Sequence, residues 1–187
     1  MKTSPYEKLL AAALAGVLAS CSPSSATLTQ MPLSSPIKSD SSLSGKVFAE
    51  VNSYRAAKGK AALQRHAGLD QLAQKHCDYL VKTAGSYDLY GKDVSHIGYE
   101  GRALAARQAY GIKRFGENVV SSKSHSAKHL VEAWSRSKTH EHNMSTDWYY
   151  TGIGTAVASD GSVISTQLFG TAPIMSGMDL KQRFNRH

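Results

Sequence analysis

Three ionisable side chains in the sequence have the types that build a metal site or an acid–base site. They are His96, Glu117 and His140, separated by 21 and 23 residues. Two imidazoles with one carboxylate form a known catalytic zinc set that leaves a fourth position open. The carboxylate could instead orient one imidazole from behind it, or all three could form a network that only ties segments of chain together. If the fold brings the three side chains together, His96 and His140 are the residues expected to hold zinc or another divalent cation.

Polar residues beside the three candidates are expected to support them. Asn118 directly follows Glu117, and Ser137 and Asn143 each stand three residues from His140. Short polar side chains bond readily to nearby backbone groups. We therefore expect these residues to hold the chain around the cleft in place.

Motifs for a dedicated nucleophile or a phosphate loop are missing. The sequence contains no G-x-S-x-G, H-E-x-x-H, C-x-x-C or P-loop pattern. Gly152 and Gly154 form a G-I-G step, but no third glycine follows and the step lies in a strand-like pattern, which argues against a dinucleotide site. Binding is therefore favoured over catalysis, and whether the protein is an enzyme stays open.

Helical patterns come first along the chain and strand patterns close it. Apolar residues recur at helical spacing in four stretches, 47–54, 69–81, 103–110 and 126–137. Gly59, Gly85 and Gly111 are expected to end the first three, and residues 86–101 are expected to form a loop. Extended segments are predicted over 115–120, 149–157 and 163–169, with a turn at 159–162. This order predicts an α+β fold.

The first twenty residues have the composition of an export signal. Lys2 and Lys8 form a basic region before an uncharged stretch, 9–18, of Leu, Ala, Gly and Val. Ten helical residues span about 15 Å, against a hydrocarbon core of about 30 Å, so the stretch is too short to cross a membrane. The next step, Leu-Ala-Ser-Cys, resembles the lipobox of bacterial lipoproteins. That resemblance implies cleavage before Cys21 and a lipid on its thiol.

A lipid on Cys21 would make the membrane a partner and would place the protein in the cell envelope. In a Gram-negative host the expected place is the outer membrane. The 24 residues that follow Cys21 include nine Ser and three Pro, which favours a disordered tether over 21–45. The folded domain is expected over 46–174, with 175–187 as a C-terminal tail.

The chain is basic, with a formal charge of +8 that falls to +7 when residues 1–20 are removed. Its Lys and Arg residues are scattered, and no basic run with interleaved aromatic residues points to nucleic acid. If Cys21 is lipidated, Cys77 has no partner for an intramolecular disulfide. The apolar helical pattern around Cys77 predicts a buried structural thiol.

Five short motifs in a fixed order resemble the CAP superfamily of cysteine-rich secretory, antigen 5 and pathogenesis-related proteins, and its small bacterial members most. They are S-H-x-G at 95–98, G-E-N-V at 116–119, W-x-x-S-x-x-H-x-x-N at 134–143, G-I-G at 152–154 and F-G at 169–170. Asn52 and Arg55 also fit the N-x-x-R start of the family's first helix. The resemblance extends over about 47–170.

The resemblance implies an α-β-α sandwich, with a small, mainly antiparallel sheet between helices. It also implies that His96, Glu117 and His140 meet in one cleft. Many animal members have a second glutamate where this chain has Ser137, so three ionisable groups are expected here and not four. The ligands that the family suggests are lipids, sterols or peptides.

Three functions are compatible with these observations. The first is a surface-tethered module whose cleft binds a small hydrophobic molecule or an extended ligand such as a peptide. The second is a metal-assisted hydrolase that acts on peptide or envelope polymer, and the third is an adhesion domain. The absence of a nucleophile motif favours the first and the third.

Overall fold

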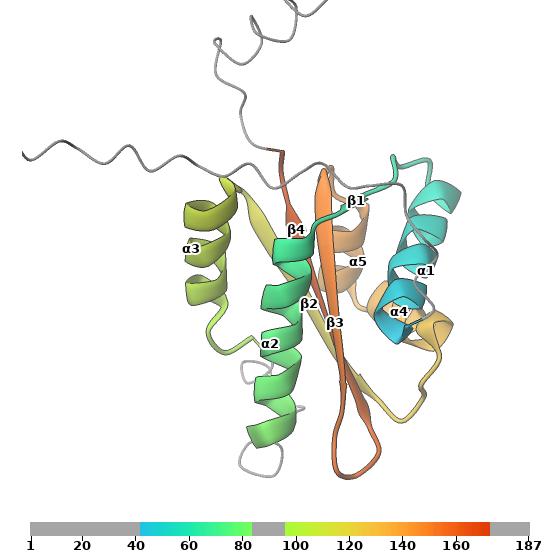
Figure 1. Ribbon diagram of the computed structural model, residues 1–187. Helices are drawn as coiled ribbons and strands as arrows, with labels where there is room; N and C mark the ends of the chain where they lie inside the picture. Colours follow the sequence, from blue (N-terminus) through green and yellow to red (C-terminus); the bar gives the residue numbers. More distant parts are fainter. Residues whose placement is uncertain (1–41, 84–95, 173–187) are drawn as a thin grey trace, which may run out of the picture. The chain divides into compact units, whose positions relative to one another are not determined.

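The computed structural model describes residues 42–83 and 96–172. Helices and strands alternate irregularly along this part of the chain (Figure 1). In order they are α1 (Leu43–Ala57), β1 (Gln64–Arg65), α2 (Ala67–Thr83), α3 (Tyr99–Tyr110), β2 (Phe115–Ser122), α4 (Ala127–Arg136), α5 (Lys138–Ser145), β3 (Tyr150–Val157) and β4 (Val163–Gly170).

The four strands form one sheet in the order β1-β3-β4-β2. Strand β4 lies inside it and pairs antiparallel with both β2 and β3 over its whole length, whereas the short β1 pairs parallel with β3. Helices α2 and α3 cover one face of the sheet, and α1, α4 and α5 cover the other (Figure 1). The predicted α+β class and the mainly antiparallel sandwich are therefore confirmed.

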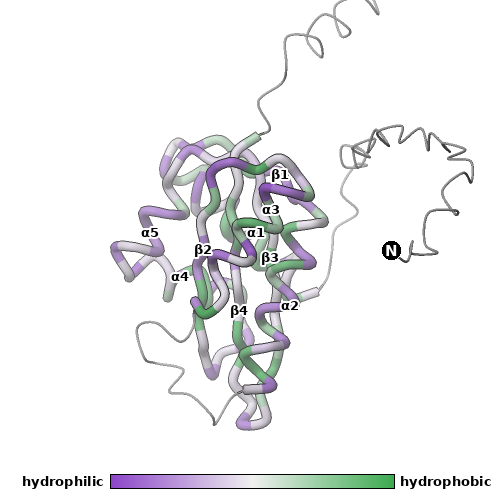
Figure 2. Tube along the Cα trace, turned by 90° about the vertical axis from the view of Figure 1, so that its left-hand side faces the viewer, coloured by the Kyte–Doolittle hydropathy of each residue, from purple (hydrophilic) through white to green (hydrophobic). Residues whose placement is uncertain are grey.

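Apolar side chains fill both gaps between the sheet and its helices. On the α1 and α4 side, Trp134 and Phe169 belong to the largest buried cluster, together with Ile153 of β3. On the α2 and α3 side, Leu69 packs with Leu168. Every residue of β4 is buried, because helices cover both faces of this inner strand. In Figure 2 the largely polar α5 lies on the opposite side of the sheet from α2.

The G-I-G step brings α2 unusually close to strand β3. A Cβ atom at Gly152 would lie 2.2 Å from the backbone of Leu69, and one at Gly154 would lie 2.4 Å from the backbone of Ala73. The intervening Ile153 points to the other face, since strand side chains alternate. Glycine is needed here for close packing of a helix on a strand.

Side chains of α2 also complete the hydrogen bonds of β3 beyond the end of β1. Asp70 Oδ1 accepts from the backbone N–H of Ile153 at 2.8 Å. Gln74 accepts from the N–H of Thr155 at 3.1 Å and donates to its carbonyl at 3.0 Å. The exposed part of this strand edge is thereby covered.

Some predicted boundaries were wrong. Helix α1 begins at Leu43, four residues before the predicted helical stretch 47–54, because Ser42 Oγ accepts from the N–H of Gly45 at 3.1 Å and caps the helix. Helix α3 begins at Tyr99, after Gly98 with φ of 75°, so the predicted loop does not extend to residue 101.

The predicted signal peptide, Cys21 and most of the tether lie outside the described residues, as do residues 84–95 and the predicted C-terminal tail. Among the described residues, no helix is both long and apolar enough to cross a membrane.

Candidate functional site

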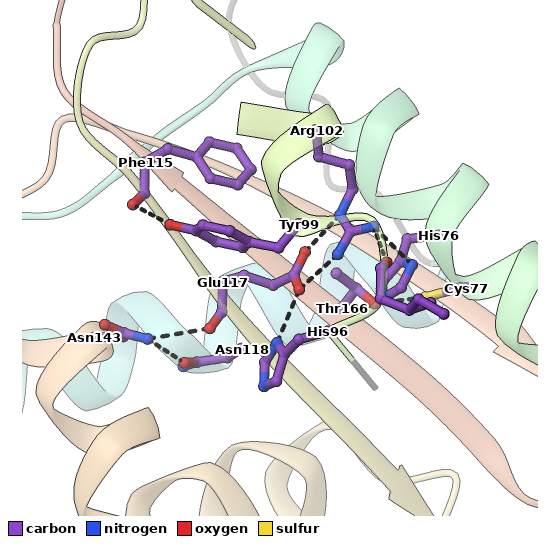
Figure 3. A network of polar contacts seen from close by, with 11 residues as sticks. His76, Cys77, His96, Tyr99, Arg102, Phe115, Glu117, Asn118, Asn143 and Thr166 are labelled. Carbon is purple, nitrogen blue, oxygen red and sulfur yellow. Dashed lines mark hydrogen bonds and ion pairs between the residues drawn. The ribbon is translucent and has the colours of Figure 1, made fainter. Parts of the chain in front are cut away.

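Glu117 is the centre of a polar cluster between α3 and the sheet (Figure 3). Its side chain projects from β2 and is 1% exposed. Arg102 of α3 donates from Nε to Oε2 at 2.6 Å and from Nη2 to Oε1 at 2.7 Å. His96 Nδ1 lies 2.9 Å from Oε1. Bidentate pairs of a guanidinium and a carboxylate are among the strong hydrogen-bonded contacts of proteins.

These contacts keep Glu117 ionised in spite of its burial. Burial by itself raises the pKa of Glu117, but hydrogen bonds from His96 and Arg102, together with the charges of Arg102 and His76, outweigh it and lower the pKa below 4.5. A carboxylate only accepts hydrogen bonds, so His96 donates from Nδ1. In a neutral His96 ring, Nε2 is then the nitrogen with a free lone pair.

Arg102 is itself held from two further sides. Its Nη1 donates to the carbonyl of Ile97 at 2.8 Å and lies 3.0 Å from Nδ1 of His76, which extends from α2 (Figure 3). Arg102 and His76 were not among the residues predicted from the sequence. Arg102 lies within a helix, 15 residues before Glu117, and no local pattern distinguishes it from the exposed Arg107 on the same helix.

His140 lies next to His96, with 6.4 Å between the two ring centroids. Burial, and then the charge of His96, lowers the pKa of His140 from its usual value, which favours the neutral ring at pH 7. No hydrogen bond to either ring nitrogen is formed within the described part of the chain. The structure thus brings the three predicted residues together. Glu117 is hydrogen-bonded to His96, whereas His140 forms no hydrogen bond with either carboxylate oxygen of Glu117.

Two of the predicted supporting residues, Asn118 and Asn143, join α5 to strand β2, and the third, Ser137, caps α5. Asn143 Nδ2 donates to the carbonyl of Glu117 at 3.1 Å and to Asn118 Oδ1 at 2.9 Å. Asn118 Nδ2 donates to the carbonyl of His140 at 3.0 Å. Ser137 caps α5 and accepts from the N–H of His140 at 3.5 Å. Helix α5, which the sequence pattern did not separate from α4, begins at this cap.

A solvent-reachable hollow of about 530 Å³ lies over the cluster. This size is ordinary for a small-ligand site. Its lining includes all three predicted residues and comes from α3, β2, α5 and the segments beside them. The lining residues are His96, Tyr99, Arg114, Phe115, Gly116, Glu117, Thr139, His140, His142, Asn143, Thr146 and Trp148.

The side chains of the cluster supply two metal ligands and not a complete set of three or four. Both oxygens of Glu117 are already bonded to Arg102, so this carboxylate is placed to orient His96 and not to bind a cation directly. No group of three or more His, Cys, Asp or Glu side chains within residues 42–83 and 96–172 is arranged to hold a metal. The residues available for one are His96 and His140.

Cys77 of α2 lies close to this cluster and faces Thr166 of β4 (Figure 3). It is fully buried, and its Sγ donates to Thr166 Oγ1 at 3.2 Å. Burial raises the pKa of the thiol to about 11, so Cys77 stays protonated at neutral pH. The prediction of a buried structural thiol agrees with this environment.

The family model of the cysteine-rich secretory proteins, known as CAP, matches residues 48–169. The chain belongs to the CAP family. No curated protein sequence matches the chain significantly. The family placement therefore rests on the family model and on the fold.

Solved structures with this CAP fold include bacterial exported proteins. An extracellular SCP-domain protein of Bacillus anthracis is 18% identical, with a TM-score of 0.54 over 74% of this chain and 45% of that one. A cysteine-rich secretory protein of Staphylococcus aureus is 16% identical, with a TM-score of 0.51 over 72% of this chain and 40% of that one. The chain therefore spans less than half the length of either. An outer surface protein of Borrelia burgdorferi is 18% identical, with a TM-score of 0.47 over 67% and 90% of the two chains.

Proposed function

We propose that this CAP-family protein is exported, anchored to a membrane through a lipid on Cys21, and binds a small or extended ligand in the cleft of His96 and His140. The observation that supports the proposal best is the open hollow of about 530 Å³ over the two imidazoles. The bacterial structures with the same fold include one named as extracellular, which agrees with export. The ligand class that we favour is a lipid, a sterol or a peptide.

We further propose that His96 and His140 bind one divalent cation, with zinc as the first choice. Glu117 would fix the tautomer of His96 through Nδ1, which leaves Nε2 for the metal. The lowered pKa of His140 favours the neutral ring at pH 7, which metal binding requires. Two nitrogens bound to one zinc sit about 3–3.5 Å apart, so small side-chain rotations would close the site.

Calorimetric titration of the purified chain with zinc at pH 7.5 tests the metal. We expect wild type to bind one equivalent and His140→Ala to lose at least about tenfold in affinity. His129→Ala is the matched control, because this histidine is exposed on α4 and bonds to Ser124. Equal binding by wild type and His140→Ala would show that zinc does not use His140, and no binding by wild type would leave an organic-ligand cleft.

A ligand survey separates binding from hydrolysis and adhesion. Lipids, sterols and peptides are incubated with wild type and with the double variant His96→Ala/His140→Ala, with and without chelator. Loss of binding in the variant, with unaltered ligand recovered from wild type, supports the binding module. Cleavage of peptide or envelope polymer that is abolished by chelator supports the hydrolase. Equal binding by both proteins contradicts the cleft.

A further inference from the structure

Arg114 lies where two hollows of the surface meet. A second hollow of about 360 Å³ shares Arg114, His142 and Thr146 with the hollow that contains His96 and His140. The two hollows are therefore parts of one groove, and Arg114 is at their common border. A ligand that fills the hollow over the histidines can therefore contact this arginine.

Trp148 provides a fixed platform beneath Arg114. Its Nε1 donates to the carbonyl of Asn143 at 2.9 Å, and its ring stacks on Phe169 with 5.7 Å between centroids. A Cβ atom at Gly116 would lie 3.0 Å from the Trp148 ring, so the glycine of the G-E-N motif leaves the space that the ring occupies. The indole is held from three sides.

The guanidinium of Arg114 lies over this ring, with 4.9 Å between Cζ and the ring centroid. Stacking uses the face of the guanidinium and leaves the N–H groups at its edge free to donate. No carboxylate or hydrogen-bond acceptor among the described residues contacts these N–H groups. Arg114 is thus positioned by its platform and has unused donors toward the groove.

Each carboxylate that lines the groove in the described part of the chain has a cationic partner. Glu117 is paired with Arg102. Glu141 accepts from Tyr54 and Ser145 and lies 3.7 Å from Lys58, and Asp147 lies 3.4 Å from Lys60. Within residues 42–83 and 96–172, the positive charge of Arg114 is therefore left without an anionic partner at the border of the hollows.

From these contacts we infer that Arg114 on Trp148 is an oxyanion subsite, and that the ligand of the cleft has a carboxylate or phosphate group. The inference rests on the proposed cleft function and narrows its ligand class. A planar guanidinium with free edge donors binds such groups through two parallel hydrogen bonds. Apolar parts of the ligand would lie on Phe115 and Tyr99, which line the first hollow.

The test compares probes that differ only in their head group. Decanoate, decyl phosphate and uncharged decanol are titrated into the full chain, and the indole N–H signal of Trp148 is followed by NMR. The chain has two tryptophans, and Trp134 is fully buried, so Trp148→Phe assigns the signal. We expect both anions to bind wild type at least about tenfold more tightly than decanol.

Two variants assign this preference to one residue. Arg114→Gln should lower the affinity for both anions at least about tenfold and so remove their preference over decanol. Lys113→Gln, which removes the same charge from the exposed neighbour outside both hollows, should keep the preference. Arg114→Lys should give an intermediate preference, because an ammonium lacks the planar fork.

Inorganic phosphate and acetate distinguish the source of the oxyanion. If phosphate and acetate shift the Trp148 signal in wild type and not in Arg114→Gln, a free anion is sufficient for binding. If only the decyl compounds shift it, the oxyanion is the head group of a lipid. Any of three results would overturn the subsite. These are equal affinity of wild type for the anions and decanol, equal loss of anion affinity in Arg114→Gln and Lys113→Gln, and no binding of any probe. The ligand survey with His96→Ala/His140→Ala tests the cleft without changing Arg114, so failure of the proposed function is recognised separately.

Discussion

At the scale of single residues, the charge balance around Glu117 is the main determinant of the site. A carboxylate that is 1% exposed is tolerated because Arg102 gives it two short hydrogen bonds and an opposite charge. His96 donates a third bond to the same carboxylate. Glu117 therefore orients His96, and its own buried charge is compensated by Arg102.

Arg102→Leu tests this balance through stability. The substitution leaves Glu117 buried without its cation, so the free energy of unfolding should fall by about 3 kcal/mol. Urea unfolding at pH 7, followed by tryptophan fluorescence, measures it. Arg107→Leu, an exposed change on the same helix, is the control and should cost less than about 0.5 kcal/mol.

A second substitution separates charge from packing. Glu117→Gln in the Arg102→Leu background removes the unpaired charge, so it should recover part of the lost stability. If Arg102→Leu and Arg107→Leu cost the same, or if the double variant is no more stable than Arg102→Leu, the buried pair is not what limits stability.

The thiol of Cys77 gives an independent prediction at this scale. A fully buried thiol with a pKa of about 11 has almost no thiolate at pH 8 and no access for reagent. In the Cys21→Ser chain, a disulfide reagent should react with no thiol in the native protein and with one in guanidinium chloride. Rapid reaction of the native chain would instead indicate an accessible, functional cysteine.

At the scale of elements, the approach of α2 to β3 sets the thickness of one side of the sandwich. Two glycines of one strand face the helix backbone, and two side chains of α2 bond to the free edge of that strand. The helix and the strand therefore fit together as a unit. The cluster of Glu117 depends on this unit, because His76 reaches Arg102 from α2.

Gly154→Ala should disrupt that unit. The new Cβ would lie 2.4 Å from the backbone of Ala73, which cannot rotate away, so α2 must move. We expect a loss of about 3 kcal/mol in the free energy of unfolding, measured by urea titration. Gly101→Ala in α3 is the matched control. A Cβ atom added at Gly101 would meet nothing within 4 Å, so alanine should stabilise the helix by about 0.5–1 kcal/mol.

At the scale of the whole molecule, the CAP domain is one part of a chain that we propose to be lipid-anchored. The described domain begins with the cap at Ser42, so about twenty residues separate it from Cys21. A spacer of this kind would let the cleft face its ligand at a distance from the membrane. The oxyanion subsite and the anchor are independent proposals.

Metabolic labelling with palmitate tests the anchor. In a bacterial host, wild type should incorporate label and Cys21→Ser should not, because the thiol is the acceptor of the lipid. Cys77→Ser is the control and should still be labelled. Equal labelling of wild type and Cys21→Ser, or a mature mass that retains residues 1–20, would contradict the lipoprotein proposal.

The sequence alone determined the kinds of elements, their order and the family. Helical spacing, glycine stops and the strand pattern are local properties, and they predicted α2, α4 and the β3–β4 hairpin within a few residues. Five spaced motifs predicted the CAP fold and the residues that meet near Glu117. The short β1 and the separate α5 were not predicted, since two residues of parallel pairing and an eight-residue polar helix with one buried residue leave little periodic signal.

Only the tertiary structure decided how those residues are used. Arg102, His76, Arg114 and Trp148 contact the site or its border, although each is ordinary in its own stretch of sequence. Likewise, G-I-G was expected to belong to a strand, but only the approach of α2 explained why its glycines are needed. The physical reason is common to these cases. The partner of a side chain across a sheet or between helices is chosen by packing of distant segments, and no local pattern records that choice.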